Sequence, residues 1–154
     1  MARRRMLSLL GLALAVAGSD PPERDAMRPL LVLSAGGEAV TGLLLLADPQ
    51  LVGRLLFGGK IVGAGMVMSR IAGISLIALG VACWPRRDAE NSAPRALPAL
   101  LTYSLPVTAY LAAVGIDGQT VGRLLWPAAA GHAALTILLA RAWLGGGRIG
   151  WWKR

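Results

Sequence analysis

The sequence predicts an all-α fold: a four-helix transmembrane bundle made of two repeated helical hairpins, with both termini in the cytoplasm. The composition points to a membrane, because 55% of the 154 residues are hydrophobic and only 16% are charged, whereas soluble domains carry about 25% charged residues. Four apolar segments are long enough to cross a bilayer as helices. The basic residues gather at the ends of these segments and are divided unequally between the two sides.

The net charge of +8 raises the question of nucleic-acid binding. The basic residues, however, stand beside apolar runs and form no stripe with interleaved aromatic residues. We therefore expect no nucleic-acid partner and expect the apolar segments to lie in a lipid bilayer. Cys83 is the only cysteine, which excludes an internal disulfide and a thiolate metal cluster. We expect it to be a small apolar residue at a helix end.

We divide the chain into three parts. Residues 1–28 are an N-terminal extension, residues 29–144 are the transmembrane domain, and residues 145–154 are a tail rich in Gly, Trp and basic residues. The extension contains a short apolar run, residues 6–18, behind three arginines, which is the pattern of a signal peptide. The tail, together with Trp143, has the composition of an anchor at the membrane surface.

The distribution of basic residues argues against cleavage of the extension. With four spans, twelve basic residues fall on one side and three on the other, so the positive-inside rule places both termini in the cytoplasm of a bacterial inner-membrane protein. The three are Arg54, Lys60 and Arg123. A cleaved signal would export Arg24 and Arg28 and invert every later span. Met27, just before the first span, stands as an alternative start.

The four predicted spans cover residues 29–47, 61–84, 97–115 and 121–144. Pro29 and Pro98 are predicted in the first turn of their helices, where a missing N–H costs nothing. Pro106 and Pro127 lie inside or near the start of the third and fourth spans. Such prolines are tolerated because neighbouring helices can satisfy the freed carbonyl groups.

An internal repeat connects the two halves of the domain. The segments "DPQLVGRLLFG" (48–58) and "DGQTVGRLLWP" (117–127) share seven of eleven residues at an offset of 69. Each follows an odd-numbered span and leads into an even-numbered one, which predicts two hairpins of the same orientation. The alternative is that two similar loops arose from a biased composition.

Two charged residues lie midway along predicted spans, Glu38 in the first and Arg70 in the second. An arginine at the centre of a bilayer costs about 2.5–3.5 kcal/mol and usually faces a partner or a cavity. The two spans run antiparallel, so we predict an ion pair between Glu38 and Arg70 inside the bundle. Its plainest role is structural, because either charge alone would be expensive.

The second hairpin carries no matching pair. Its third span has Tyr103 and Tyr110 one heptad apart, and its fourth span has His132 with Thr136 one turn later. If all four helices face one centre, Glu38, Arg70, Tyr103, Tyr110 and His132 form one intramembrane polar cluster. For His132 we leave open a hydrogen bond across helices and a ligand contact. We predict no metal site, because one histidine and one paired glutamate are a poor ligand set, and we assign no catalytic residue.

The arrangement resembles the small four-helix bacterial membrane proteins of the DoxX-like type, whose relatives are mostly of unknown function. The segments that carry the resemblance are "LLFGG" (55–59), "SRIAGISLIALGVACW" (69–84) and "LLWPAAAGHAALTILLARAW" (124–143). The resemblance implies a four-helix fold over most of residues 28–144. Some proteins of this type are described as subunits of quinone-linked membrane oxidoreductases, but no cofactor motif in this chain supports that activity.

Three functions are compatible with these features. The first is an accessory or scaffold subunit that acts through helix–helix contacts, with a membrane-protein partner or as a homo-oligomer, and that has no catalytic site and no cofactor. The second is a proton-coupled transporter of a small solute, in which Glu38 would be the proton carrier. The third is a membrane redox subunit that holds a quinone head group with Tyr103, Tyr110 and His132.

Overall fold

The computed structural model describes residues 24–85 and 89–148, and the side chains of residues 27–85 and 95–145. These residues form five helices, four long and one short. In chain order they are α2 (Arg24–Ala47), α3 (Pro49–Phe57), α4 (Ala64–Ala82), α5 (Ala89–Asp117) and α6 (Leu125–Arg148). The predicted all-α class is confirmed. The four long helices contain the candidate membrane spans Met27–Ala47, Ala64–Ala82, Arg95–Asp117 and Leu125–Gly145, so the chain is a multi-pass membrane protein with four candidate spans.

Two helices begin earlier than predicted. α2 starts at Arg24, and Pro29 lies inside it. α5 starts at Ala89, so Pro98 also lies within a helix and not in its first turn. A proline removes one intrahelical hydrogen bond, and near the end of a long helix that loss does not stop the chain from remaining helical. Within the predicted extension and tail, residues 24–28 and 145–148 are helical. Residues 1–23 and 149–154, with the predicted signal-like run and most of the anchor, lie outside the described residues.

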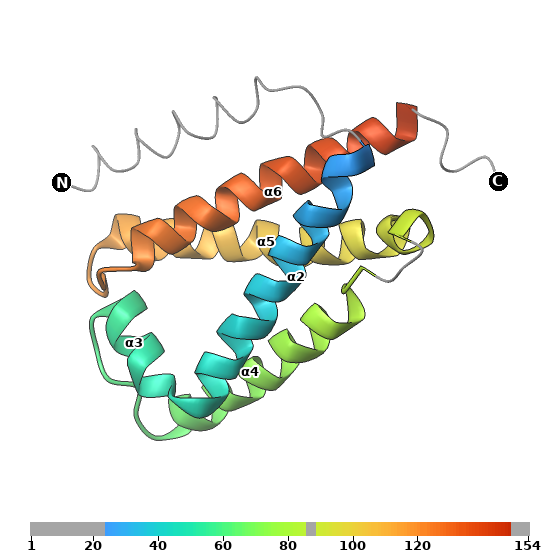
Figure 1. Ribbon diagram of the computed structural model, residues 1–154. Helices are drawn as coiled ribbons and strands as arrows, with labels where there is room; N and C mark the ends of the chain where they lie inside the picture. Colours follow the sequence, from blue (N-terminus) through green and yellow to red (C-terminus); the bar gives the residue numbers. More distant parts are fainter. Residues whose placement is uncertain (1–23, 86–88, 149–154) are drawn as a thin grey trace.

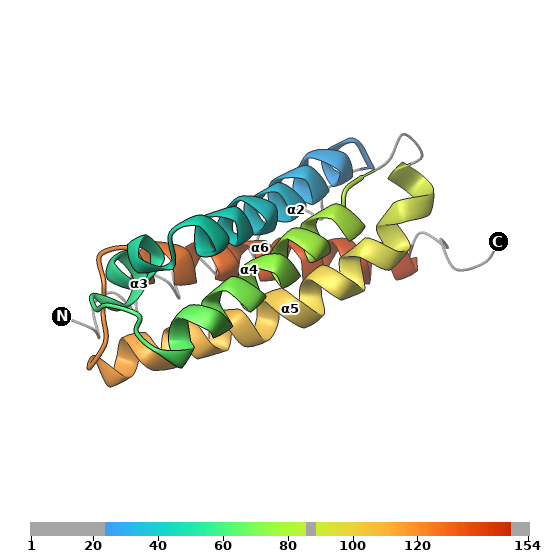
Figure 2. The same ribbon diagram turned by 90° about the horizontal axis from the view of Figure 1, so that it is seen from below.

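The long helices pair in two antiparallel hairpins. α4 packs mainly against α2, and α5 packs mainly against α6. α2 also contacts α5 and α6 and thereby joins the hairpins (Figure 1). The connections α2–α4 and α5–α6 lie at one end of the molecule, next to α3, as the second view also shows (Figure 2). Along most of its length α4 therefore packs against α2 alone, and only its end, at Leu79 and Cys83, reaches the cluster that α5 and α6 share.

Glycine brings α2 and α4 close together. A Cβ atom added at Gly73 would lie 2.6 Å from the Gly42 carbonyl oxygen, and one added at Gly80 would lie 2.6 Å from the Ala35 carbonyl oxygen. Small residues allow helix backbones to approach in this way, and dispersion contacts then replace the hydrophobic driving force that is absent between helices in lipid. The α2–α4 interface therefore depends on residues that have almost no side chain.

The end of the molecule near α3 contains both copies of the sequence repeat. In the first copy Asp48 caps α3, and its side chain accepts a hydrogen bond from the Leu51 N–H. In the second copy residues 118–124 are not helical, and α6 begins only at Leu125. The copies thus adopt different conformations. They meet directly, because the N–H groups of Gly122 and Leu124 donate to the carbonyl groups of Leu56 and Leu55, at 2.7 and 2.8 Å.

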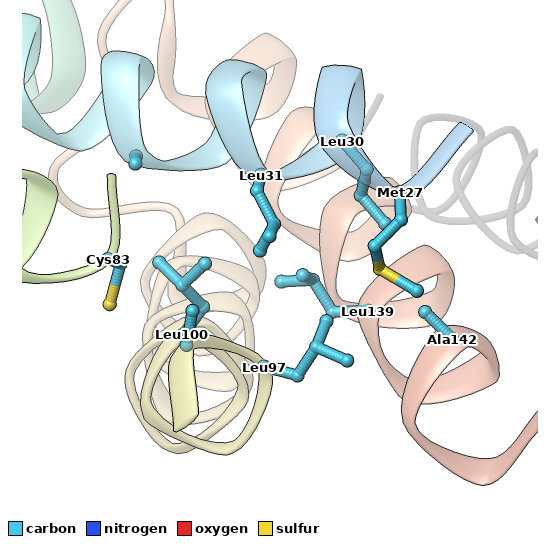
Figure 3. Close-up of a cluster of buried hydrophobic side chains, with 10 residues drawn as sticks. Met27, Leu30, Leu31, Cys83, Leu97, Leu100, Leu139 and Ala142 are labelled. Atoms are coloured by element: carbon cyan, nitrogen blue, oxygen red, sulfur yellow. The ribbon is translucent and has the colours of Figure 1, made fainter. Parts of the chain in front are cut away.

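Two clusters of buried apolar side chains hold the helices together. The first joins α2, α5, α6 and the end of α4 (Figure 3). Its members are Met27, Leu30, Leu31, Ala35, Cys83, Ala96, Leu97, Leu100, Leu139 and Ala142. The second lies toward the connections and is made by Leu111, Leu125 and Ala129, with Phe57 of α3 packed against it. Between the two clusters the helices contribute polar residues.

Candidate functional site

A layer of buried polar side chains lies at the edge of the first apolar cluster and between it and the second. It draws on three helices: Ser34 and Glu38 come from α2, Ser104 from α5, and Thr136 from α6, and all four are buried. Their positions along the chain explain the layer. On α5, Ser104 falls between Leu100 of the first cluster and Leu111 of the second, and on α6, Thr136 falls between Leu139 and Ala129.

Hydroxyl groups link α5 to α6 within this polar layer. Thr136 donates to the Ser104 hydroxyl oxygen at 2.9 Å, and Ser104 donates to the His132 carbonyl oxygen at 3.4 Å. Thr108 donates to the Ser104 carbonyl oxygen at 2.8 Å, and its hydroxyl oxygen lies 3.2 Å from that of Thr136. Side-chain hydrogen bonds between membrane helices contribute on average about 0.6 kcal/mol each. The network therefore fixes the register of α5 against α6 more than it adds stability.

Glu38 lies at the centre of the polar layer. Only 5% of its surface is exposed, and it forms a side-chain hydrogen bond with Tyr103 of α5. The Tyr103 ring in turn meets the His132 ring of α6 edge-on, with ring centroids 6.3 Å apart and an angle of 67° between the planes. A carboxyl group, a phenol and an imidazole, one from each of three helices, thus lie next to one another in that order.

The predicted ion pair between Glu38 and Arg70 is not formed: among the described residues no salt bridge joins the two, and Arg70 is exposed while Glu38 is buried. The direction of the Arg70 side chain around α4 is the first reason why the ion pair is not formed. At about 100° per residue, Arg70 points roughly 60–80° away from Gly73 and Gly80, the residues through which α4 approaches α2. Arg70 therefore lies off the surface through which α4 contacts α2.

The different depths of Glu38 and Arg70 in the membrane are the second reason why the ion pair is not formed. Gly42 lies opposite Gly73 and Ala35 lies opposite Gly80, which places Glu38 level with Ile77 in the antiparallel pair. Arg70 comes seven residues before Ile77, so the two charges differ in height by about 10 Å at 1.5 Å per residue. Equal distance from the ends of two predicted spans was too coarse a measure of depth.

The structure brings together three of the five residues predicted to form the cluster and keeps two apart. Glu38, Tyr103 and His132 meet at the interior. Arg70 is exposed, and Tyr110 has 67% of its surface exposed. Tyr103 and Tyr110 are one heptad apart and point in nearly the same direction on α5, but α5 packs mainly against α6 and has few contacts with α2, so the same face of α5 is covered at Tyr103 and open at Tyr110. The hydroxyl groups of Ser104 and Thr136 are at the centre of the hydrogen-bond network. Each has a residue four positions away on the same face of its helix, Thr108 on α5 and His132 on α6.

Two polar atoms near Glu38 are buried without a hydrogen-bond partner, Ser34 Oγ and His132 Nδ1. Ser34 is one helical turn from Glu38, and 2% of its surface is exposed. Within residues 24–85 and 89–148, no three His, Cys, Asp or Glu side chains lie close enough to hold a metal ion. The chemistry that this site offers is therefore hydrogen bonding and proton exchange at a carboxyl group.

Comparison with protein-family models, with curated proteins and with solved structures finds no match. No family is assigned on this basis.

Proposed function

We propose that this multi-pass membrane protein is an accessory or scaffold subunit of a bacterial inner-membrane assembly. In this proposal it acts through helix–helix contacts and has no catalytic site of its own. The observation that carries the proposal is Arg70, which is exposed on α4, the helix that packs against α2 alone along most of its length. Charged residues within membrane helices almost always pair or face a water-filled cavity. A partner helix with an acidic residue would supply what Arg70 needs.

The surroundings of Arg70 support a protein contact. Val67, Ile74 and Val81 share its face of α4 by helical spacing, and all three are exposed. Arg70 is the seventh residue of α4, about 9 Å from the start of the helix. The acidic side chains Asp48 and Asp117 are exposed at the ends of their helices. Within the part of the chain that the structure describes, Glu38 is the only acidic side chain away from the ends of a span, and it is buried next to Tyr103.

The test is site-specific photocrosslinking in native membranes. A photoreactive residue at Ile74, beside Arg70, should give one protein adduct of constant size, while the same residue at Leu105 of α5, which is equally exposed, should give none. Arg70→Leu should abolish the adduct and Arg70→Lys should retain it, since lysine keeps the charge. Neutralising the acidic residue in the partner's span should also abolish the adduct. Exchanging the two charges, with the acidic residue at position 70 and the arginine in the partner, should restore it. Adducts to lipid alone, or adducts unchanged in Arg70→Leu, would contradict the proposal.

A second function, proton-coupled transport of a small solute, is favoured by one observation. A carboxyl group that carries protons must not be held permanently charged by a cation. Arg70 points away from α2 and lies at a different depth, so it does not hold Glu38 in the charged state. Glu38→Gln should abolish proton-linked uptake in vesicles, and unchanged uptake would exclude this function. The redox function with a bound quinone would need Tyr110 beside Tyr103 and His132, and the exposure of Tyr110 does not favour it.

The finer architecture is also part of the proposal: a DoxX-like duplication of one hairpin, with both termini in the cytoplasm. The seven shared residues of the two repeat copies support the duplication, and the excess of basic residues on the side of the termini supports the orientation. A cysteine placed at Lys60, which is exposed near the outer end, in a Cys83→Ser background should react with an impermeant maleimide from outside intact cells. Reaction only after lysis would reverse the orientation.

A further inference from the structure

Glu38 is buried at the middle of its span in surroundings that offer it no close cation. The groups that face it are the Tyr103 hydroxyl from α5 and the His132 ring from α6, beyond Tyr103. The α4 side presents Gly73, Ile77 and Gly80 to α2. Among the basic residues whose side chains the structure describes, six are exposed, namely Arg28, Arg54, Lys60, Arg70, Arg95 and Arg123. Arg141 follows His132 by nine residues, about 14 Å along α6.

An ionised carboxylate is expensive in these surroundings. Taking a charge out of water costs several kcal/mol, and an opposite charge must be very close to offset that cost. A neutral carboxylic acid avoids most of the cost, provided that its polar atoms find hydrogen bonds. The Tyr103 hydroxyl suits both states, because it can donate to a carboxylate or accept from a carboxylic acid.

The site also has unused hydrogen-bonding capacity. Ser34 Oγ and His132 Nδ1 are buried without partners, one a turn before Glu38 on the same helix and the other on the ring that Tyr103 contacts. α3 adds no titratable group, because its one charged residue, Arg54, is exposed and its Nε–H donates to the Gln50 carbonyl oxygen.

We propose that Glu38 is a reversible proton-binding site inside the membrane, neutral at physiological pH, with Tyr103 as its hydrogen-bond partner. The site binds one proton on a carboxylate oxygen and releases it as the pH rises. This inference does not depend on the accessory role. Proton-coupled transport would require such a site, but the site does not require transport.

Dicyclohexylcarbodiimide tests the proposal on the intact protein in its membrane. This apolar reagent adds to the O–H of a protonated carboxyl group and rearranges to a stable N-acylurea, so that the peptide gains the mass of one whole reagent molecule. We expect an adduct on the peptide that contains Glu38 at neutral pH, and a yield that falls with rising pH as the acid ionises. Asp48 and Asp117, which are exposed, are internal controls and should be labelled several-fold less. Glu38→Gln should remove the adduct.

A second measurement covers the case in which the reagent does not reach a buried group. The infrared carbonyl band of a protonated carboxylic acid should be present at neutral pH, should vanish in Glu38→Gln, and should disappear at a different pH in Tyr103→Phe, which removes the hydrogen bond. Absence of both the adduct and the band would overturn the proposal, as would equal labelling of Glu38, Asp48 and Asp117. These results are separate from the crosslinking result at Ile74, so either proposal can fail alone.

Discussion

Between α2 and α4 the contact is made by glycine and alanine, whereas between α5 and α6 it is made by leucine together with hydroxyl groups. In the first hairpin the backbones approach so closely that a single methyl group at Gly42 would meet the Gly73 carbonyl oxygen. In the second hairpin Thr136 donates a hydrogen bond to the Ser104 hydroxyl oxygen across the interface, and the Thr108 hydroxyl lies against that of Thr136. Lipid provides no hydrophobic force between helices, so the first hairpin relies on close backbone packing and the second adds hydrogen bonds to side-chain packing. The difference predicts that the hairpins respond to different substitutions.

The largest effect should come from Gly42→Ala. The added Cβ would lie 2.5 Å from the Gly73 carbonyl oxygen and 2.9 Å from the Ile77 backbone nitrogen, and backbone atoms cannot move aside singly. Overpacking of this kind costs about 1–3 kcal/mol. Unfolding in mixed micelles with increasing SDS should show the loss. Gly37→Ala on the same helix is the matched control, because its Cβ would meet nothing within 4 Å, and an equal loss there would contradict the proposed packing.

A somewhat smaller effect is expected for Gly122→Ala at the junction of the repeat copies. Its Cβ would collide with the carbonyl group of Leu55, and the hydrogen bonds from Gly122 and Leu124 would lengthen. Because the junction lies in connecting segments that can shift, we expect the lower part of the range of about 1–3 kcal/mol. Amide hydrogen exchange at Leu124 should rise strongly in Gly122→Ala and remain unchanged in Gly59→Ala, whose Cβ would be in open space.

Thr136→Val should weaken the second hairpin by about 0.6 kcal/mol, and by no more than about 1.7 kcal/mol. The substitution keeps the shape of the side chain and removes the hydroxyl group that Ser104 and Thr108 contact. Thr102→Val, at an exposed position of α5, should have no effect in the same SDS titration. A loss at Thr136 as large as that of Gly42→Ala would mean that the hairpins are not held together differently.

The smallest effect is expected from chemical modification of Cys83, which tests the packing at the end of α4 without any substitution. Cys83 has 3% of its surface exposed within the first apolar cluster, and burial raises the pKa of its thiol. Since the thiolate is the reactive form, alkylation by N-ethylmaleimide should be slow at neutral pH and should accelerate as the pH rises. Unfolding in SDS should remove the protection. Fast alkylation of the folded protein at neutral pH would show that the end of α4 is not packed as described.

The sequence was sufficient for the number of spans and for part of the site. Apolar runs of about 20 residues are decided by the thickness of the bilayer alone, and all four candidate spans follow from them. Helical spacing placed Ser34 and Glu38 on one face of α2, and His132 and Thr136 on one face of α6. These relations lie within single helices, and the chain itself defines them.

Relations between helices could not be predicted in the same way. Whether Glu38 meets Arg70 or Tyr103 depends on the register of α2 against α4, and that register is set by contacts of individual atoms at Gly42, Gly73 and Gly80. Likewise, identical residues in the two repeat copies do not share a conformation, because Asp48 caps a helix while Asp117 ends one. A pair of opposite charges in neighbouring spans therefore remains a hypothesis until the register is determined.

The most direct test of this account compares two double-mutant cycles in SDS unfolding. One combines Glu38→Gln with Tyr103→Phe, and the other combines Glu38→Gln with Arg70→Leu. Groups in contact show coupling energies of about 0.5–3 kcal/mol, while distant groups add within about 0.5 kcal/mol. The account predicts coupling between Glu38 and Tyr103 and additivity between Glu38 and Arg70. Coupling of Glu38 to Arg70, with additivity for Tyr103, would contradict it.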